Sequence, residues 1–275
     1  PPMVPLFTMG DAEKAMEQFV EINYDQPLTI AQGVVVTFRD AGHILGSSGV
    51  LIEINEKGKK IRFGYAGDIG RDGMPIIHDP NCLRDLDILV MESTYGNRLH
   101  DDLADAEEEL ADIIRSTSKS GGRVIVPSFA IGRTQRLVYM LHKLFDQGRI
   151  PEIPIYVDSP MAFNATEVFR KHPECFDRQT NRIFVKENED PFGFRRLKYV
   201  YTADESKALN GLAFPHLIIS SSGMAEGGRI LHHLKNNIEK RNSLILFVGF
   251  AAQETLARKI MDGQKSIEAR LTKTR

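Results

Sequence analysis

The sequence predicts an α/β protein in which a strand-rich part is followed by a part with a mainly parallel sheet. Before about residue 95, β-branched or aromatic runs are separated by short polar turns: 33–38, 50–55, 60–66 and 87–91. Such runs are typical of strands joined by hairpins, so we expect an antiparallel or mixed sheet there. After residue 100, apolar runs bounded by glycine alternate with amphipathic segments. That alternation predicts a parallel sheet covered by helices on both faces.

In the second part, predicted strands alternate with predicted helices. The expected strands are 123–129, 153–158, 216–222 and 243–250. The expected helices are 103–117, 132–147, 160–171, 226–239 and 253–262. The segment 176–200 is polar, with a local cluster of Arg and Lys, and we expect it to be a loop. The last residues, 267–275, are interpreted as the start of a further strand.

The composition excludes some classes of protein. Among 275 residues, 35 basic side chains nearly balance 37 acidic ones, so any surface that binds a polyanion must be local. The two cysteines, Cys82 and Cys175, lie far apart in the sequence, which argues against a disulfide framework and favours a reducing cytoplasm. No apolar run approaches the roughly 20 residues of a membrane span, so we expect no membrane association.

Three side chains that can bind a metal or a proton follow predicted strands of the first part. His43 lies in the glycine-rich segment Asp-Ala-Gly-His-Ile-Leu-Gly-Ser-Ser-Gly at 40–49, Asp68 lies between two glycines, and Glu92 ends an apolar run. Taken singly, His43 is explained as a turn residue and Asp68 as a turn former. Together, at successive strand ends, they favour a functional site.

Two strand–loop–helix units in the second part have the features of anion-binding loops. One runs through "FAIGR" at 129–133, and the other contains Ser221, Ser222, Gly223 and Met224. Such loops present backbone N–H groups and the positive end of a helix dipole, and Arg133 and Arg229 lie where they could pair with phosphate oxygens. Neither loop matches a P-loop or a dinucleotide-binding loop. The alternative is that their glycines and serines only cap helices.

These segments, in this order, resemble metallo-β-lactamase-fold RNA-processing nucleases of the β-CASP group, which include relatives of the cleavage and polyadenylation specificity factor endonuclease. The resemblance extends from about residue 30 to 265. The segments that carry it are "DAGHILGSSG", "YAGDIGR", "MESTYGNR", "VPSFAIGRTQ", "IYVDSPMA", "ISSSGMAEGGRILHHL" and "FVGFAAQETLARKIMDG".

The resemblance implies a fold and an activity. Residues 1–95 would form part of a metallo-β-lactamase αββα sandwich, 96–262 an inserted β-CASP domain, and 263–275 the return to the first domain. By the same resemblance, His43 would bind one of two zinc ions (Zn²⁺), Asp68 would bridge both, and Glu92 would be the acid that orients a distant histidine. The expected activity is zinc-dependent cleavage of single-stranded RNA, with Asp68 and Glu92 catalytic. A bridging carboxylate and an imidazole suit a two-metal site of this kind.

One departure from the family pattern is large. The His-x-His-x-Asp-His motif, its supporting Asp and the two later β-CASP histidines are absent, and none of the eight histidines present is placed to replace them. We therefore expect an incomplete, inactive fragment that binds zinc weakly or not at all and cleaves no RNA. His232 and His233 are adjacent and cannot both bind one ion, so at least one is expected to be structural.

Two other functions stay open at this point. One is a non-catalytic RNA-binding subunit of the same family. The other is an unrelated α/β enzyme that uses its Gly- and Ser-containing loops to bind a nucleotide or a phosphorylated metabolite. A cytoplasmic location is expected, and a homodimer is left open.

Overall fold

The computed structural model describes residues 5–97, 99 and 102–264, and the chain divides into two compact units. The first unit consists of Pro1–Ala41, Ser47–Ile69 and Pro80–Glu92, and the second of Gly42–Gly46, Gly70–Asp79 and Ser93–Arg275. Arg98 of the "MESTYGNR" segment and the strand expected at 267–275 lie outside the described residues. The predicted domain boundaries stay predictions.

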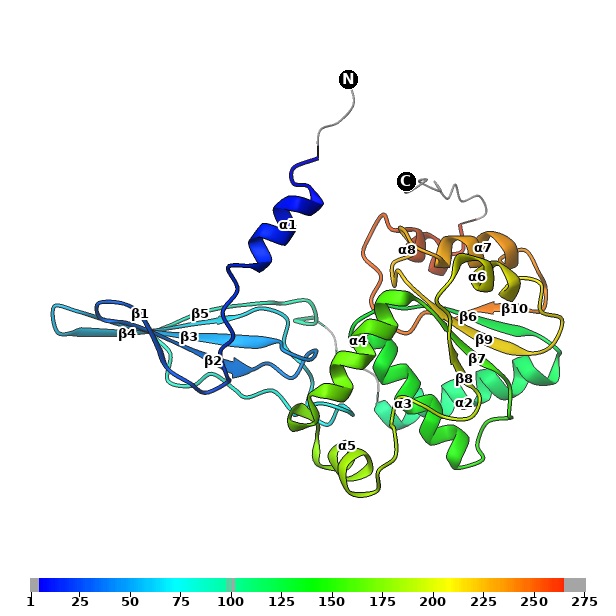
Figure 1. The fold of residues 1–275 in the computed structure, drawn as a ribbon, viewed down its shortest axis with the longest axis horizontal. Coiled ribbons are helices and arrows are strands. Elements are labelled where there is room, and N and C mark those ends of the chain that lie inside the picture. Colours follow the sequence, from blue (N-terminus) through cyan, green and yellow to red (C-terminus); the bar gives the residue numbers. More distant parts are fainter. Residues whose placement is uncertain (1–4, 98, 100–101, 265–275) are drawn as a thin grey trace. The chain divides into compact units, whose positions relative to one another are not determined.

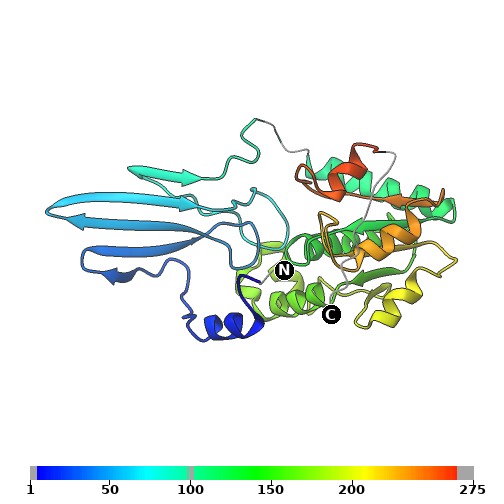
Figure 2. The ribbon, with the colours of Figure 1, turned by 90° about the horizontal axis from the view of Figure 1, so that it is seen from above.

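The first unit is built on a five-stranded sheet in the order β1-β2-β3-β4-β5 (Figures 1 and 2). The helix α1 (Met9–Met16) precedes these strands, whose bounds are β1 Leu28–Ala31, β2 Val34–Asp40, β3 Ser48–Glu56, β4 Lys59–Ala66 and β5 Ile88–Met91. Neighbours from β1 to β4 are antiparallel, whereas β5 is parallel to β4. Lys57 and Gly58 join β3 to β4 with positive φ angles of 50° and 79°, because a two-residue turn of this kind matches the twist of the strands. The expected mixed sheet is confirmed.

The second unit is built on a five-stranded parallel sheet in the order β10-β6-β9-β7-β8 (Figure 1). The strands are β6 Arg123–Pro127, β7 Ile155–Asp158, β8 Leu197–Tyr199, β9 His216–Ser220 and β10 Ser243–Ile245. The main helices are α2 Leu103–Lys119, α3 Arg133–Asp146, α4 Pro160–Lys171, α6 Ala203–Leu209, α7 Ile230–Asn237 and α8 Leu256–Met261. In the described ranges, no helix is long and apolar enough to cross a bilayer.

Apolar side chains cover both faces of the parallel sheet. Successive strand residues point to opposite faces, so Val124 and Val126 join a cluster with α2, α3 and α4, while Ile125 joins one with α6, α7 and α8. Figure 1 shows α6, α7 and α8 on one side of the sheet and α2 and α3 on the other. The predicted fold class, with a mainly parallel sheet covered on both faces, is confirmed.

The loop expected at 176–200 is the main error in the predicted elements. The segment contains the short helix α5 (Arg178–Asn181), a π-helical turn at Arg182–Lys186, and the strand β8. Phe176 and Phe192 are both buried, with ring centroids 6.0 Å apart, and they anchor the segment to the core. Most polar side chains of the segment lie on its outer surface. For this reason its polar composition wrongly predicted a loop.

Candidate functional site

The order of strands predicts a ligand crevice at the carboxyl ends of β6 and β9. The chain moves one way along the sheet from β6 to β7 and β8, then returns to β9 and passes beyond β6 to β10. Because crossovers between parallel strands are right-handed, the reversal sends α3 and α7, the helices that follow β6 and β9, to opposite faces. Neighbouring strands whose helices diverge in this way form a ligand crevice at their carboxyl ends. The two loops predicted to bind phosphate follow these two strands.

The two loops are in direct contact. Ser128, after β6, donates its backbone N–H to the carbonyl of Ser220 at 2.9 Å. Gly223 packs so closely on Phe129 that an added Cβ would lie 2.6 Å from the Cδ2 atom of the ring and 2.9 Å from the Phe129 nitrogen. A small pocket opens at this junction between Phe129, Arg133, Gly223 and the segment 247–250. The structure therefore brings Arg133 and Gly223 to one place.

Arg133 lies in the wall of this pocket. Its Nη1 atom donates to the carbonyl of Val248 at 2.6 Å, and its guanidinium lies against Gly249, where an added Cβ would be 2.9 Å from the Arg133 Cζ atom. Burial lowers the pKa of Arg133 from its ordinary value. Within the described ranges Arg133 forms no ion pair with a carboxylate.

The loop 221–229 is held in shape by one of its serines. Ser222 Oγ accepts hydrogen bonds from the N–H groups of Glu226 at 3.1 Å and Gly227 at 3.3 Å. The Ser222 N–H in turn donates to the Gly227 carbonyl at 3.1 Å. In the part of the chain that the structure describes, the N–H groups of Gly223 and Met224 meet no acceptor. Two consecutive unpaired donors can form a concavity that binds an anion.

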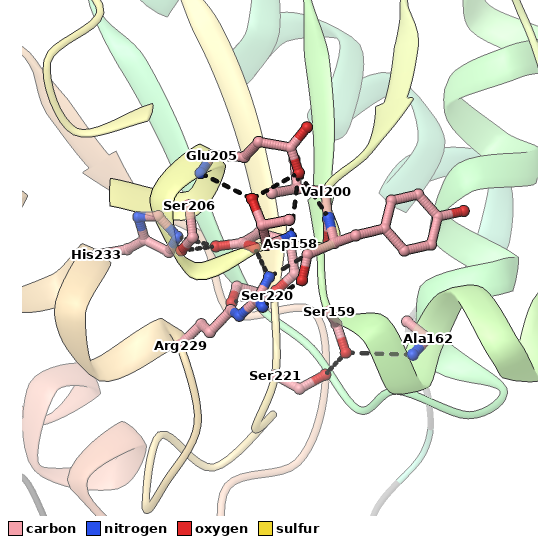
Figure 3. A network of polar contacts seen from close by, with 12 residues as sticks. Asp158, Ser159, Ala162, Val200, Glu205, Ser206, Ser220, Ser221, Arg229 and His233 are labelled. Atoms are coloured by element: carbon pink, nitrogen blue, oxygen red, sulfur yellow. Dashed lines mark hydrogen bonds and ion pairs between the residues drawn. The ribbon is translucent and has the colours of Figure 1, made fainter. Parts of the chain in front are cut away.

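A buried carboxylate, Asp158 at the end of β7, is bonded to Arg229 of this loop (Figure 3). Its Oδ1 atom is bound by Arg229 Nη1 at 2.7 Å, and its Oδ2 atom by His233 Nε2 at 2.6 Å and by the hydroxyl of Ser206. Burial raises the pKa of Asp158, but hydrogen bonds from these three side chains outweigh it, so its pKa lies below the ordinary value. Asp158 is therefore ionised and paired.

The network around Asp158 holds both ends of the loop. At one end, Arg229 also donates to the carbonyls of Val200 at 3.3 Å and Tyr201 at 2.6 Å. At the other end, the hydroxyl of Ser221 donates to Ser159 Oγ at 3.1 Å (Figure 3). Arg229 thus has several partners inside the protein, and its contacts describe a residue that positions the loop. Its predicted phosphate contact stays a prediction.

His233 and Asp158 illustrate what sequence reasoning missed. His233 is fully buried, and its Nδ1 atom lies 3.1 Å from Asn210 Oδ1, so the expectation that one of the paired histidines is structural is confirmed. Asp158 was not singled out, although a carboxylate at the end of an apolar run and before Ser159-Pro160 is the same signal that identified Glu92. Its partners lie 48 to 75 residues away, which no local pattern reveals.

The residues predicted to bind zinc lie in separate compact units. In the first unit, Glu92 Oε1 accepts the N–H of Ile69 at 2.9 Å, so the segment after Asp68 is bonded to the end of β5. In the second unit, the carbonyl of His43 accepts a hydrogen bond from Arg136 Nη2 at 3.3 Å. Among the described residues, no three His, Cys, Asp or Glu side chains form a group that could hold a metal ion. The roles of His43, Asp68 and Glu92 stay predictions.

Comparison with known proteins defines the class of this protein. The profile of the Beta-Casp domain family matches residues 134–260, which run from the first turn of α3 to α8 and include β9 and the loop 221–229. Relatives also align along almost the whole chain. The chain therefore contains a Beta-Casp domain, and the resemblance drawn from its sequence motifs is confirmed.

The similar proteins have names that concern RNA and transcription. The chain is 32% identical over 257 residues to Ribonuclease TTHA0252 of Thermus thermophilus, which covers 94% of the chain and 58% of that protein. It is 34% identical over 263 residues to an RNase J-like protein of Methanocaldococcus jannaschii, with 94% and 59% covered. It is 30% identical over 266 residues to the Transcription termination factor FttA of the same organism, with 95% and 41% covered. The chain thus spans less than two thirds of the length of these relatives.

Proposed function

We propose that this chain binds single-stranded RNA at the crevice between β6 and β9 and belongs to a zinc-dependent ribonuclease that cleaves phosphodiester bonds. The observation that carries the proposal is the pocket that Arg133 and Gly223 both line, next to a loop in which the N–H groups of Gly223 and Met224 meet no acceptor among the described residues. The names of the ribonuclease relatives support RNA as the ligand.

In this proposal the loop residues have distinct roles. Arg133 and the backbone of Gly223 and Met224 bind phosphate oxygens, since guanidinium and amide N–H groups are suitable donors for them. Ser221 and Ser222 keep the loop in shape, and Arg229 positions it through Asp158. A net charge of −2 does not oppose RNA binding, because the positive charge that matters is confined to the crevice.

The proposed metal chemistry rests on the family resemblance. His43 and Asp68 would be two of the zinc ligands, and Glu92 the acid that orients a distant histidine near the leaving group. We expect this chain to bind fewer than two zinc ions tightly and to show no cleavage, as measured by metal analysis after dialysis and by digestion of a labelled RNA. Two tightly bound zinc ions per chain would contradict this expectation. In a protein with the complete site, Asp68→Ala should abolish cleavage and lower the zinc content, whereas His232→Ala should change neither.

RNA binding can be tested on the chain as it is. We expect the affinity for a single-stranded RNA to fall with rising salt, because phosphate contacts release counterions. Gly223→Ala should weaken binding about tenfold, which corresponds to ~1.4 kcal/mol, because a Cβ there displaces the loop from Phe129. Gly211→Ala is the matched control, since a Cβ at Gly211 meets only the Ala208 carbonyl, at 3.5 Å. Absence of RNA binding by the unmodified chain at low salt would rule out the proposal.

The alternative functions are separated by two further measurements. A non-catalytic RNA-binding subunit would bind RNA equally well. Joining this chain to an intact His-x-His-x-Asp-His motif and adding zinc would still not produce cleavage. An enzyme acting on a nucleotide or a phosphorylated metabolite would bind a mononucleotide as tightly as RNA. Light scattering would test the homodimer, and fractionation of cells the cytoplasmic location.

A further inference from the structure

Two arginines on α3 lie one turn apart and close to each other. Arg133 and Arg136 occupy positions i and i+3, which share a face of a helix, and both are half-buried. Burial, and then the positive charge of Arg133, lower the pKa of Arg136 to about 10. Two like charges are thus held together in partly desolvated surroundings.

Neither guanidinium has an anionic partner in the described ranges. Two other partly buried arginines of the second unit are paired with carboxylates, Arg170 with Asp190 at 2.6 Å and Arg229 with Asp158 at 2.7 Å. Arg133 and Arg136 instead donate to backbone carbonyls, and form no ion pair with any described residue. Removing a charge from water is costly unless the charge is paired. The positive charges of Arg133 and Arg136 are therefore not compensated by an anion from the described residues.

The guanidiniums retain donors that a ligand can reach. An arginine has five N–H donors, and the structure assigns acceptors only to Arg133 Nη1, at 2.6 Å, and Arg136 Nη2, at a longer 3.3 Å. Neither residue is among those whose side-chain nitrogens are buried without a partner, so the remaining N–H groups reach solvent. The arrangement suits a small anion with several oxygens.

Arg136 also connects this place to the loop that carries His43. The Arg136 guanidinium donates to the His43 carbonyl, and Ile44 packs on the start of α3, where a Cβ added to Gly132 would lie 2.5 Å from the Ile44 Cγ2 atom. All of these residues belong to the second unit. An anion held by Arg136 would therefore lie beside the segment 42–46.

We propose that Arg133 and Arg136 together form one anion site that takes a single phosphate group, and that Arg136 is a phosphate-binding residue. That this phosphate belongs to RNA rests on the proposed function. The paired guanidiniums supply charge and forked N–H donors, which match the oxygens of a phosphate. The site extends the contact surface along α3 from the pocket of Arg133 towards the segment 42–46.

The test uses the complete chain with three variants. Arg136→Met removes the charge and keeps a long apolar side chain, whereas Arg136→Lys keeps the charge without the planar fork. Arg241→Met is the matched control, because Arg241 is exposed, forms no ion pair with a described residue and lies just before β10, at the amino end of the sheet. The first probe is pyrophosphate, and the readout is the melting temperature with and without it.

We expect pyrophosphate to raise the melting temperature of the unmodified chain and of Arg241→Met, because a ligand that binds only the folded state stabilises it. Arg136→Met should lose at least half of this rise, and Arg136→Lys should restore part of it. Without pyrophosphate, Arg136→Met should melt no lower than the unmodified chain, since it removes an uncompensated charge. An undiminished rise in Arg136→Met, or a fall of several degrees without the probe, would overturn the proposal.

The second probe is single-stranded RNA at several salt concentrations. For Arg136→Met, the slope of the logarithm of affinity against the logarithm of salt should decrease by about 0.7, the value for one phosphate contact on a single strand. Arg241→Met should keep the slope. If the pyrophosphate response depends on Arg136 but the RNA slope does not, the anion site stands and its assignment to RNA fails.

Discussion

Two apolar strands of similar length, β5 and β6, have opposite surroundings. In β5 the side chains of Ile88, Leu89, Val90 and Met91 are 47% to 54% exposed, whereas every residue of β6 is buried. Apolar sequence predicts a strand in both cases, but burial depends on the layers that pack against it. The second unit has helices on both faces of its sheet, so its loops are fixed by its own contacts.

Removing the buried carboxylate of the second unit should have the largest effect. Asp158→Asn leaves Arg229 and His233 without their anion, and breaking such a pair costs about 3–5 kcal/mol. Because Arg229 is partly exposed, the lower end of this range is expected in urea unfolding. Asp204→Asn, at an exposed position beside Lys207, should leave stability unchanged. A loss below 1 kcal/mol for Asp158→Asn would mean that the network does not hold the loop.

Shortening one leucine in each sheet compares the two units directly. Leu217 in β9 is completely buried, so Leu217→Ala should cost about 2–5 kcal/mol of unfolding free energy. Leu89 in β5 is 48% exposed, and Leu89→Ala should cost less than about half as much, because less apolar area is lost. Equal losses, measured by urea unfolding of both variants, would show that β5 is as well packed as β9.

The stability that Asp158 contributes should depend on pH in a defined direction. Its pKa in the folded protein lies below the ordinary value of 3.8, so its contribution is fully present above that value. The contribution is lost as the pH falls through the lower, folded pKa. The difference in unfolding free energy between the unmodified chain and Asp158→Asn should therefore be constant near neutral pH and shrink in strong acid. A difference that grows on acidification would contradict an ionised Asp158.

The smallest effect is expected within the loop 221–229. Ser222→Ala removes the acceptor of the N–H groups of Glu226 and Gly227, which should cost about 1 kcal/mol. RNA affinity should fall with it, because the loop loses its shape. Ser118→Ala on α2, where the hydroxyl has no hydrogen-bond partner in the described ranges, is the control. Unchanged stability and binding in Ser222→Ala would show that the loop is held by its two ends alone.

The sequence predicted the elements of the site better than their arrangement. The loops after β6 and β9 were recognisable because each combines an apolar run, small residues and an arginine. Their adjacency depends on a crossover that returns the chain to β6 after about ninety residues, and such pairing has no local signal. Arg136 was missed for the same reason. We propose it as a phosphate-binding residue because it has no carboxylate partner among the described residues, and only the folded chain shows this.

The helix α6 was missed although its start had a clear signal. Thr202 and Glu205 form a capping box, in which each side chain accepts the backbone N–H of the other. The helix has only seven residues, too few for apolar periodicity to be visible. A helix this short is recognised in a sequence by its capping residues and not by the periodicity of its apolar residues.

The division of the chain into interleaved segments limits how the protein can be dissected. The segment 70–79 belongs to the second unit although the first unit continues after it. It supplies Ile76 and Ile77, both buried, and the Ile76 N–H donates to Asp177 Oδ2 at 2.7 Å. A gene that starts at residue 93 would therefore encode a second unit without part of its own core. The parallel sheet depends for its stability on residues translated before it.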